Sequence, residues 1–308
     1  MKNRKIVCYL ICTAFILLGP AWVHAGKKVP ILKATSKPAS KRTTARTKPP
    51  TSRPSKKVLP RKKATGLPPQ VKKAMARIIK TQKAGFLRHD FKTYMSLWTP
   101  TVKMLAGRGP KAGKYDILMT YQQIADRKAF EFLAKPEKNL QMRHMVKNWS
   151  FKGKQIMLQF ETIMNYGTRT EIVVGEIYRL KKGKNGWQAY ENRWWPVHRK
   201  VGMYVVILDA HFYRKMDEKI KRFKSKGMYW RYLELLAQTY RFAEARDFLA
   251  NFVQKQPRKL RAWLMLGYMS LFTGHISQAK RAFRRAQAIF PNARVHPSMK
   301  LLKKKPKK

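Results

Sequence analysis

Two stretches near the C-terminal end of the chain resemble each other at a spacing of thirty-four residues, and this repeat constrains the fold most strongly. The first copy runs from Tyr229 to Pro257 and the second from Trp263 to Pro291. A repeat of this length fits two helices and a turn, because each unit buries one face against its neighbour. We therefore expect an all-α module over 227–294, with these packing residues: Tyr229, Ala245, Pro257, Trp263, Leu266, Gly267, Ala279, Phe283, Ala286 and Pro291.

The order of residue types in the second copy resembles the tetratricopeptide repeat family. Trp263 is a large anchor, Gly267 permits close helix approach, Ala279 and Ala286 are small, and Pro291 ends the unit. The family binds other proteins and rarely catalyses reactions, so the resemblance implies a protein-binding module. An acidic partner would suit the basic residues expected on its concave face or flank, for which the alternative is a solvated helix face: Arg261, Lys280, Arg281, Arg284 and Arg285.

The first 25 residues predict export from the cell. Lys2 and Lys5 precede an apolar run from Ile6 to Leu18, and small residues follow near Ala25. The run is shorter than the roughly 20 apolar residues of a membrane-spanning helix. We expect a signal peptide cleaved near Ala25, with an uncleaved anchor as the alternative. The product would be periplasmic, associated with a bacterial envelope, or secreted.

Both cysteines, Cys8 and Cys12, lie within the predicted signal peptide. The mature chain would therefore contain no disulfide, no thiol nucleophile and no thiolate metal site. The seven histidines lie apart and lack the spacing of a two-ligand helix, so we predict neither a metal nor a cofactor.

The formal charge of +54 on 308 residues implies polyanionic surroundings. No acidic residue precedes Asp90, and residues 26–69 consist largely of Lys, Arg, Pro, Thr and Ser. We expect a disordered basic linker there and a basic tail over 295–308. The linker would be a tether to an anionic envelope polymer or lipid headgroups, or else a passive spacer. Nucleic acid would bind without sequence specificity, in a salt-dependent way.

Residues 70–200 predict an α+β domain. Apolar spacing favours helices over 71–79, 91–98 and 115–133, a short strand over 102–105, and longer strands over 141–151, 155–165, 170–180 and 187–196. A connecting helix over 201–226, or a strand followed by a helix, would pack this domain against the repeats.

This element order resembles the nuclear-transport-factor-2-like cone fold, in which a curved antiparallel sheet and helices surround an apolar cavity. The segments Phe86–Tyr94 and Gly186–Tyr190 also resemble that family. The resemblance implies the cone fold for residues 70–200 and a possible homodimer through the sheet.

Enzymes of the ketosteroid isomerase and polyketide cyclase type place a carboxylate or histidine base in such a cavity. The corresponding candidates are three carboxylates on successive strands, with His144 one strand earlier: Glu161, Glu176 and Glu191. A buried carboxylate of raised pKa can act as a general base. The alternative is cross-strand pairing with arginines such as Arg179 and Arg193.

Aromatic residues on or beside the predicted sheet are candidates for ligand stacking, with core packing as the alternative: Trp98, Tyr190 and Trp194. The glycine-rich segment Gly107–Lys114 does not match a phosphate-binding loop, because Tyr115 replaces the Ser or Thr that holds magnesium. We interpret it as a basic loop at the mouth of the cone.

Together these patterns favour an exported, non-catalytic adaptor of the cell envelope, with a cationic tether and helical repeats that bind a protein. The alternative is a small-molecule-binding protein, or an isomerase- or cyclase-like enzyme, that uses the cone pocket. A filled cone would favour the adaptor, and a deep pocket with a buried carboxylate would favour the alternative.

Overall fold

The computed structural model describes residues 66–111, 113–167, 170–183, 186–202 and 204–299. The predicted signal peptide and basic linker lie almost wholly outside these residues, as does most of the predicted basic tail. Among the described residues, no helix combines the length and apolar character needed to cross a bilayer.

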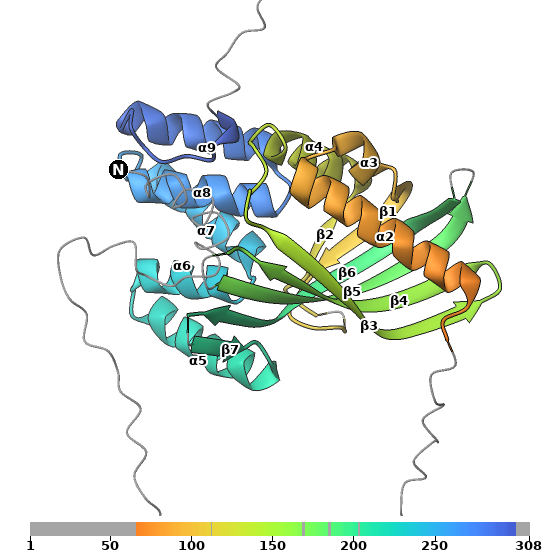
Figure 1. Cartoon of the computed structure of the whole chain (residues 1–308). Helices are drawn as coiled ribbons and strands as arrows, with labels where there is room; N and C mark the ends of the chain where they lie inside the picture. The colour runs from red at the N-terminus through yellow and green to blue at the C-terminus, as the bar shows by residue number, and fades with distance from the viewer. Residues whose placement is uncertain (1–65, 112, 168–169, 184–185, 203, 300–308) are drawn as a thin grey trace, which may run out of the picture.

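The first part of the described chain forms a curved sheet with three helices (Figure 1). Its elements, in chain order, are α2 (Pro69–Arg88), α3 (Phe91–Met95), β1 (Trp98–Ala106), β2 (Ile117–Met119), α4 (Tyr121–Glu131), β3 (Gln141–Lys152), β4 (Gln155–Asn165), β5 (Thr170–Gly183), β6 (Gly186–Val201) and β7 (Tyr204–Ile207). The strands follow the order β2-β1-β6-β5-β4-β3, and β7 also pairs with β6. The β1–β6 pair is parallel and the others are antiparallel, so the predicted antiparallel sheet is in fact mixed.

Residue alternation along the long strands sets one face of the sheet against the helices. On β4, Ile156, Leu158 and Phe160 are buried, and α2 contributes Val71 and Ile78 to the same core. The predicted fold class is confirmed: an α+β cone precedes an all-α C-terminal part.

Two predicted boundaries were wrong in the N-terminal half. The helix expected over 91–98 ends at Met95, and Trp98 begins the strand β1. Pro100 is accommodated where the β1–β6 register shifts between Trp98 and Lys103, as proline in a strand requires. The helix expected over 115–133 begins only after Thr120, which caps α4 in a capping box with Gln123, and the preceding residues form β2.

Within the described part of the chain, these helices follow the sheet: α5 (Ala210–Ser225), α6 (Tyr229–Gln238), α7 (Phe242–Lys255), α8 (Leu260–Phe272) and α9 (Ile276–Ile289). We call α6–α9 the helical module. Figure 1 places it beside α4, at one end of the cone. The buried residues of the cone and of the helical module form one continuous core cluster.

The predicted packing residues of the helical module lie in three environments. Leu266, Gly267 and four others are buried, namely Ala245, Ala279, Phe283 and Ala286. Gly267 lies directly against the ring of Phe283, and a Cβ there would be 2.3 Å from ring carbon Cε1. Trp263 is half-buried and donates its indole N–H to the carbonyl of Pro257 at 2.7 Å. Three are exposed: Tyr229, Pro257 and Pro291.

Candidate functional site

A cavity of about 230 Å³ lies inside the cone. Its walls are mostly aromatic and aliphatic, and they come from the inner face of the sheet, from α2–α4 and from the helical module. The polar side chains on its wall are few: Gln82, Arg127, Lys128, Thr162, Glu176 and Asn192, with the hydroxyls of the tyrosines. Largely apolar walls with a few polar groups are typical of small-molecule sites.

Glu176, Tyr178 and Gln82 form a buried hydrogen-bonded group on this wall, which we call the Glu176 cluster. The hydroxyl of Tyr178 donates to Glu176 Oε2 at 2.7 Å, and the amide of Gln82 donates to the same oxygen at 2.6 Å. The Gln82 amide also donates to the Tyr178 hydroxyl at 2.5 Å. All three residues are less than a tenth exposed.

Strand periodicity explains how the Glu176 cluster assembles. Glu176 and Tyr178 are two residues apart on β5, so both side chains point to the inner face of the sheet. Gln82 reaches them from the buried face of α2, ninety-four residues earlier in the chain than Glu176. Trp98 stacks on the ring of Tyr178, with 6.0 Å between ring centroids, and restricts that ring.

Burial controls the acidity of the Glu176 cluster. It raises the pKa of Glu176 above the ordinary value of 4.5, although hydrogen bonds from Tyr178, Thr162 and Gln82 act to lower it. Burial and the neighbouring Glu176 carboxyl raise the pKa of the Tyr178 hydroxyl as well. The site therefore favours the neutral, protonated forms of both groups.

Two buried polar atoms of the cavity-lining residues have no hydrogen-bond partner within the described protein. They are the Oε1 acceptor of Gln82 and the Nε1 donor of Trp98. An unsatisfied buried polar atom costs about 1 to 3 kcal/mol, so each one favours a bound polar group. One acceptor and one donor are thus available beside the Glu176 cluster.

A second polar group on the cavity wall is already paired internally. Glu131 accepts hydrogen bonds from Arg127 and from Lys128, each at 2.7 Å. Burial acts to raise the pKa of Glu131, but these two cations outweigh it and hold the pKa well below its usual range. The Lys128 ammonium lies 4.6 Å from the ring centroid of Phe86, which shields it from solvent. These three charged groups neutralise one another in part and have a structural role beside the cavity.

Among the predicted base candidates, Glu176 lines the cavity, whereas Glu161 and His144 are not among its lining residues. Glu161 lies on β4 between inward-facing residues and pairs with Lys147 at 2.8 Å. His144 is hydrogen-bonded to the Thr162 hydroxyl at 3.0 Å, and burial lowers its pKa to about 4. It therefore contacts Thr162, a cavity-lining residue, without lining the cavity itself.

The predicted cross-strand pairing with an arginine is observed for Glu191, whereas Arg193 has a partner outside the three candidate carboxylates. Arg179 pairs with Glu191 at 3.2 Å, and Arg193 pairs with Asp116 at 2.8 Å. The described residues form no ion pair with Glu176.

Two of the three predicted stacking residues, Trp98 and Trp194, line the cavity. Tyr190 does not line it, and its hydroxyl donates to Gln155 at 3.2 Å. Several residues that line the cavity were not predicted from the sequence. Of these, Gln82 and Tyr178 follow the helical and strand periodicities of α2 and β5, whereas others come from the helical module: Tyr240, Phe242 and Phe272.

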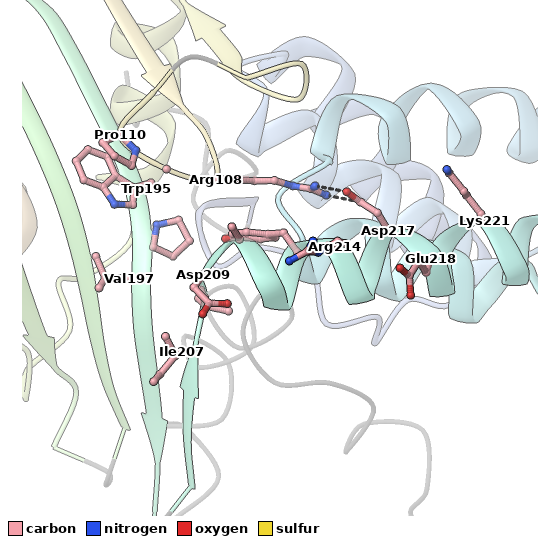
Figure 2. Close-up of a pocket in the computed structure, with 15 residues that line it drawn as sticks. Arg108, Pro110, Trp195, Val197, Ile207, Asp209, Arg214, Asp217, Glu218 and Lys221 are labelled. Carbon is pink, nitrogen blue, oxygen red and sulfur yellow. Dashed lines mark hydrogen bonds and ion pairs between the residues drawn. The ribbon is translucent and has the colours of Figure 1, made fainter. Parts of the chain in front are cut away.

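A second hollow, of about 770 Å³, lies between β6, β7, α5 and the loop that carries Arg108 (Figure 2). Its wall includes Trp195, on the opposite face of β6 from Trp194. Arg108, in the glycine-rich segment, points to α5 and forms two hydrogen bonds with Asp217, at 2.7 and 3.0 Å. That segment therefore joins the cone to α5, and its arginine is already paired.

The basic residues predicted to bind a partner divide into two groups. Arg261 pairs with Glu234 and lies over the ring of Trp230, and Lys280 lies over the ring of Phe130 on α4. The other three are exposed on α9: Arg281, Arg284 and Arg285. Within the described ranges, no group of three or more His, Cys, Asp or Glu side chains is placed to hold a metal ion.

Comparison with known proteins gives no family assignment. No family model matches the chain, and no curated protein matches it. Similar solved structures include a nuclear-transport-factor-2-like protein from Shewanella baltica, with 10% identity over 41% of this chain and 94% of that one, at a TM-score of 0.32.

A ketosteroid isomerase-like protein from Erwinia carotovora is 12% identical over 42% of this chain and 98% of that one, at a TM-score of 0.31. A nuclear-transport-factor-2-like protein from Methylobacillus flagellatus is 12% identical over 43% and 96%, at 0.32. The fold of this chain is therefore defined by its own elements and strand pairings.

Proposed function

We propose that this protein binds a small, largely apolar molecule in the cone cavity, with a hydrogen-bond acceptor of the ligand directed at the Glu176 cluster. The observation that carries the proposal is the buried carboxyl of Glu176 on a cavity wall that is otherwise mostly apolar. Burying an ionised carboxyl costs free energy unless a cation pairs with it, and no described cation pairs with Glu176.

Protonated Glu176 is a hydrogen-bond donor suited to a carbonyl or ether oxygen, whereas the hydroxyl proton of Tyr178 is already donated to Glu176 Oε2. The unpaired Gln82 Oε1 and Trp98 Nε1 suit a second, neighbouring polar group of the ligand. The volume of about 230 Å³ is below the roughly 300 to 1,000 Å³ typical of pockets for drug-sized ligands. The proposed ligand is therefore a neutral molecule of one or two rings.

The test is calorimetric titration with 1-indanone and with indane, which differ in the carbonyl group. We expect 1-indanone to bind about tenfold more tightly, because one hydrogen bond in a buried site contributes about 0.5 to 1.5 kcal/mol. Its affinity should fall as the pH rises through the raised pKa of Glu176, and Glu176→Gln should remove that dependence because an amide donates at every pH. Equal binding of the two compounds, or no binding of either, would contradict the proposal.

A second candidate function is the docking of an acidic protein on α9. It is favoured by the exposure of Arg281, Arg284 and Arg285 beside the exposed apolar side chains of Ile289 and Phe290. In this hypothesis the chain is exported, residues 26–69 tether it to an anionic envelope component, and the helical module acts as tetratricopeptide-like repeats.

The test of docking is affinity capture from an envelope extract at high salt. A discrete partner should be retained by the wild type and lost when Arg281, Arg284 and Arg285 are all changed to Glu. A matched variant with Lys215, Lys219 and Lys221 of α5 changed to Glu should retain it. Loss from both variants would indicate charge attraction alone.

A further inference from the structure

Two turns of the helical module occupy equivalent positions thirty-four residues apart, but they carry different residues. Tyr240 follows α6 with a φ of 60°, and Gly274 follows α8 with a φ of 76°. The same hydrogen bond closes both turns, from Arg241 N to Leu236 O at 2.9 Å and from His275 N to Ser270 O at 2.8 Å. The two turns therefore share one left-handed conformation after a helix.

Glycine is the usual residue at this position because it has no Cβ to oppose a positive φ. Gly274 follows that rule, and its turn lies directly against Gln123 of α4. Tyr240 is held in the same conformation at an energetic cost, and such residues persist only where the surrounding structure over-determines them. The first turn therefore requires an explanation for its tyrosine.

The side chain of Tyr240 provides one, because it is buried in the wall of the cone cavity. Its ring contacts Trp194 edge to face, with 6.2 Å between centroids and an interplanar angle of 79°. Phe242 lies 5.4 Å from Tyr240, and Phe272 lies 5.2 Å from Phe242, measured between ring centroids. The helical module thus supplies an aromatic wall to a cavity whose polar groups belong to the cone.

Both neighbours of Tyr240 are fixed by other elements. Arg108 donates to the carbonyl of Thr239 at 2.8 Å. Figure 2 shows that the same arginine also pairs with Asp217 of α5. Arg241 pairs with the same Asp217 at 3.1 Å. The guanidinium of Arg241 lies 4.1 Å from the ring centroid of Tyr115. We call this group the Arg108–Asp217–Arg241 junction.

We propose that Tyr240 is a specificity-determining residue of the cavity, and that the Arg108–Asp217–Arg241 junction positions it to contact a flat ring of the ligand. This inference rests on the proposed function of the cavity. The polar end of the ligand is bound by the cone, and the ring lies beside Trp194 and Tyr240. The binding site is therefore completed by the docked helical module.

The test compares 1-indanone with cyclopentanone, which has the carbonyl but lacks the fused aromatic ring, by calorimetric titration. Tyr240→Leu should weaken 1-indanone binding about tenfold, through the loss of an aromatic contact, and leave cyclopentanone binding unchanged. Tyr240→Phe should retain both affinities because it keeps the ring. Gly227→Ala strains a left-handed turn after α5, where no adjacent residue lines the cavity, so it should lower thermal stability without changing either affinity.

A second variant keeps the proposal testable if Tyr240→Leu does not fold. Asp217→Asn weakens the junction while retaining Tyr240, and it should also reduce the preference for 1-indanone over cyclopentanone. If the wild type binds neither ketone, the proposed function is wrong. If the wild type binds both and the Tyr240 and Asp217 variants keep its preference, the role of Tyr240 is wrong while the proposed function stands.

Discussion

Glu176 is a residue through which pH acts on both the fold and the cavity. Its pKa is raised in the folded state, so the folded protein binds this proton more tightly than the unfolded chain does. Stability from this group is fully present below the unfolded pKa, near 4.5, and is lost as the pH rises through the folded pKa. Removing the charge should therefore remove this loss.

We predict that Glu176→Gln is more stable than the wild type at pH 8, and that its advantage decreases as the pH falls toward 4.5. The measurement is the thermal unfolding midpoint of both proteins across this range. Glu161→Gln is the matched control, because Glu161 lies on the neighbouring strand and pairs with Lys147. An advantage of Glu176→Gln that is the same at every pH would contradict the assignment.

The sequence named Glu176 and Glu161 as equal candidates, and strand parity distinguishes them. On β4 the apolar residues Ile156, Leu158 and Phe160 alternate with polar ones, which directs Glu161 away from the core. Glu176 occupies an inward position on β5, within the run Ile172–Tyr178. That run is buried at nearly every position, so its alternation does not show in the sequence.

At the scale of elements, local patterns predicted the long strands and helices but missed the short strand β2. The strands β3–β6 appeared near their predicted positions because each carries ten or more residues of strand pattern. The three-residue β2 is defined by pairing with β1, for example Met104 with Met119, and β7 is defined by pairing with β6. A strand whose only signal is a distant partner cannot be located from its own residues.

The contact between α8 and α9 gives an element-scale prediction. Gly267→Ala should destabilise the protein by about 1 to 3 kcal/mol, because its Cβ would lie 2.3 Å from the Phe283 ring. This outweighs the roughly 1 kcal/mol by which alanine is favoured over glycine in a helix interior. Chemical denaturation measures the change, with Gln254→Ala on the exposed side of α7 as the control. A Gly267→Ala variant that is more stable than the wild type would contradict the close contact between Gly267 and the Phe283 ring.

At the scale of the whole molecule, the cone and the helical module share a core and a cavity wall. The sequence predicted both parts and named Glu176 among the residues of the pocket, but it did not predict that Tyr240 and Phe272 would close the cavity. That contact depends on how two modules dock, and residues more than forty positions apart, such as Tyr240 and Trp194, carry no local signal of it.

The Arg108–Asp217–Arg241 junction gives the prediction at this scale. Arg108→Gln should lower the free energy of unfolding by about 1 to 3 kcal/mol, because it removes hydrogen bonds to Asp217 and to the Thr239 carbonyl. Lys103→Gln, at an exposed position of the preceding strand β1, is the control. Denaturation followed by tryptophan fluorescence and by circular dichroism should give one coincident transition for the wild type. Two separate transitions would contradict a shared core.

The most direct test of the central claim is a crystal structure of the protein soaked with 1-indanone. We expect the ring in the cone cavity beside Trp194, with the carbonyl oxygen within hydrogen-bonding distance of the Glu176 carboxyl. Density for the ketone in the hollow beside Arg108 and α5, or a cone cavity that stays free of it at saturating concentration, would contradict the account.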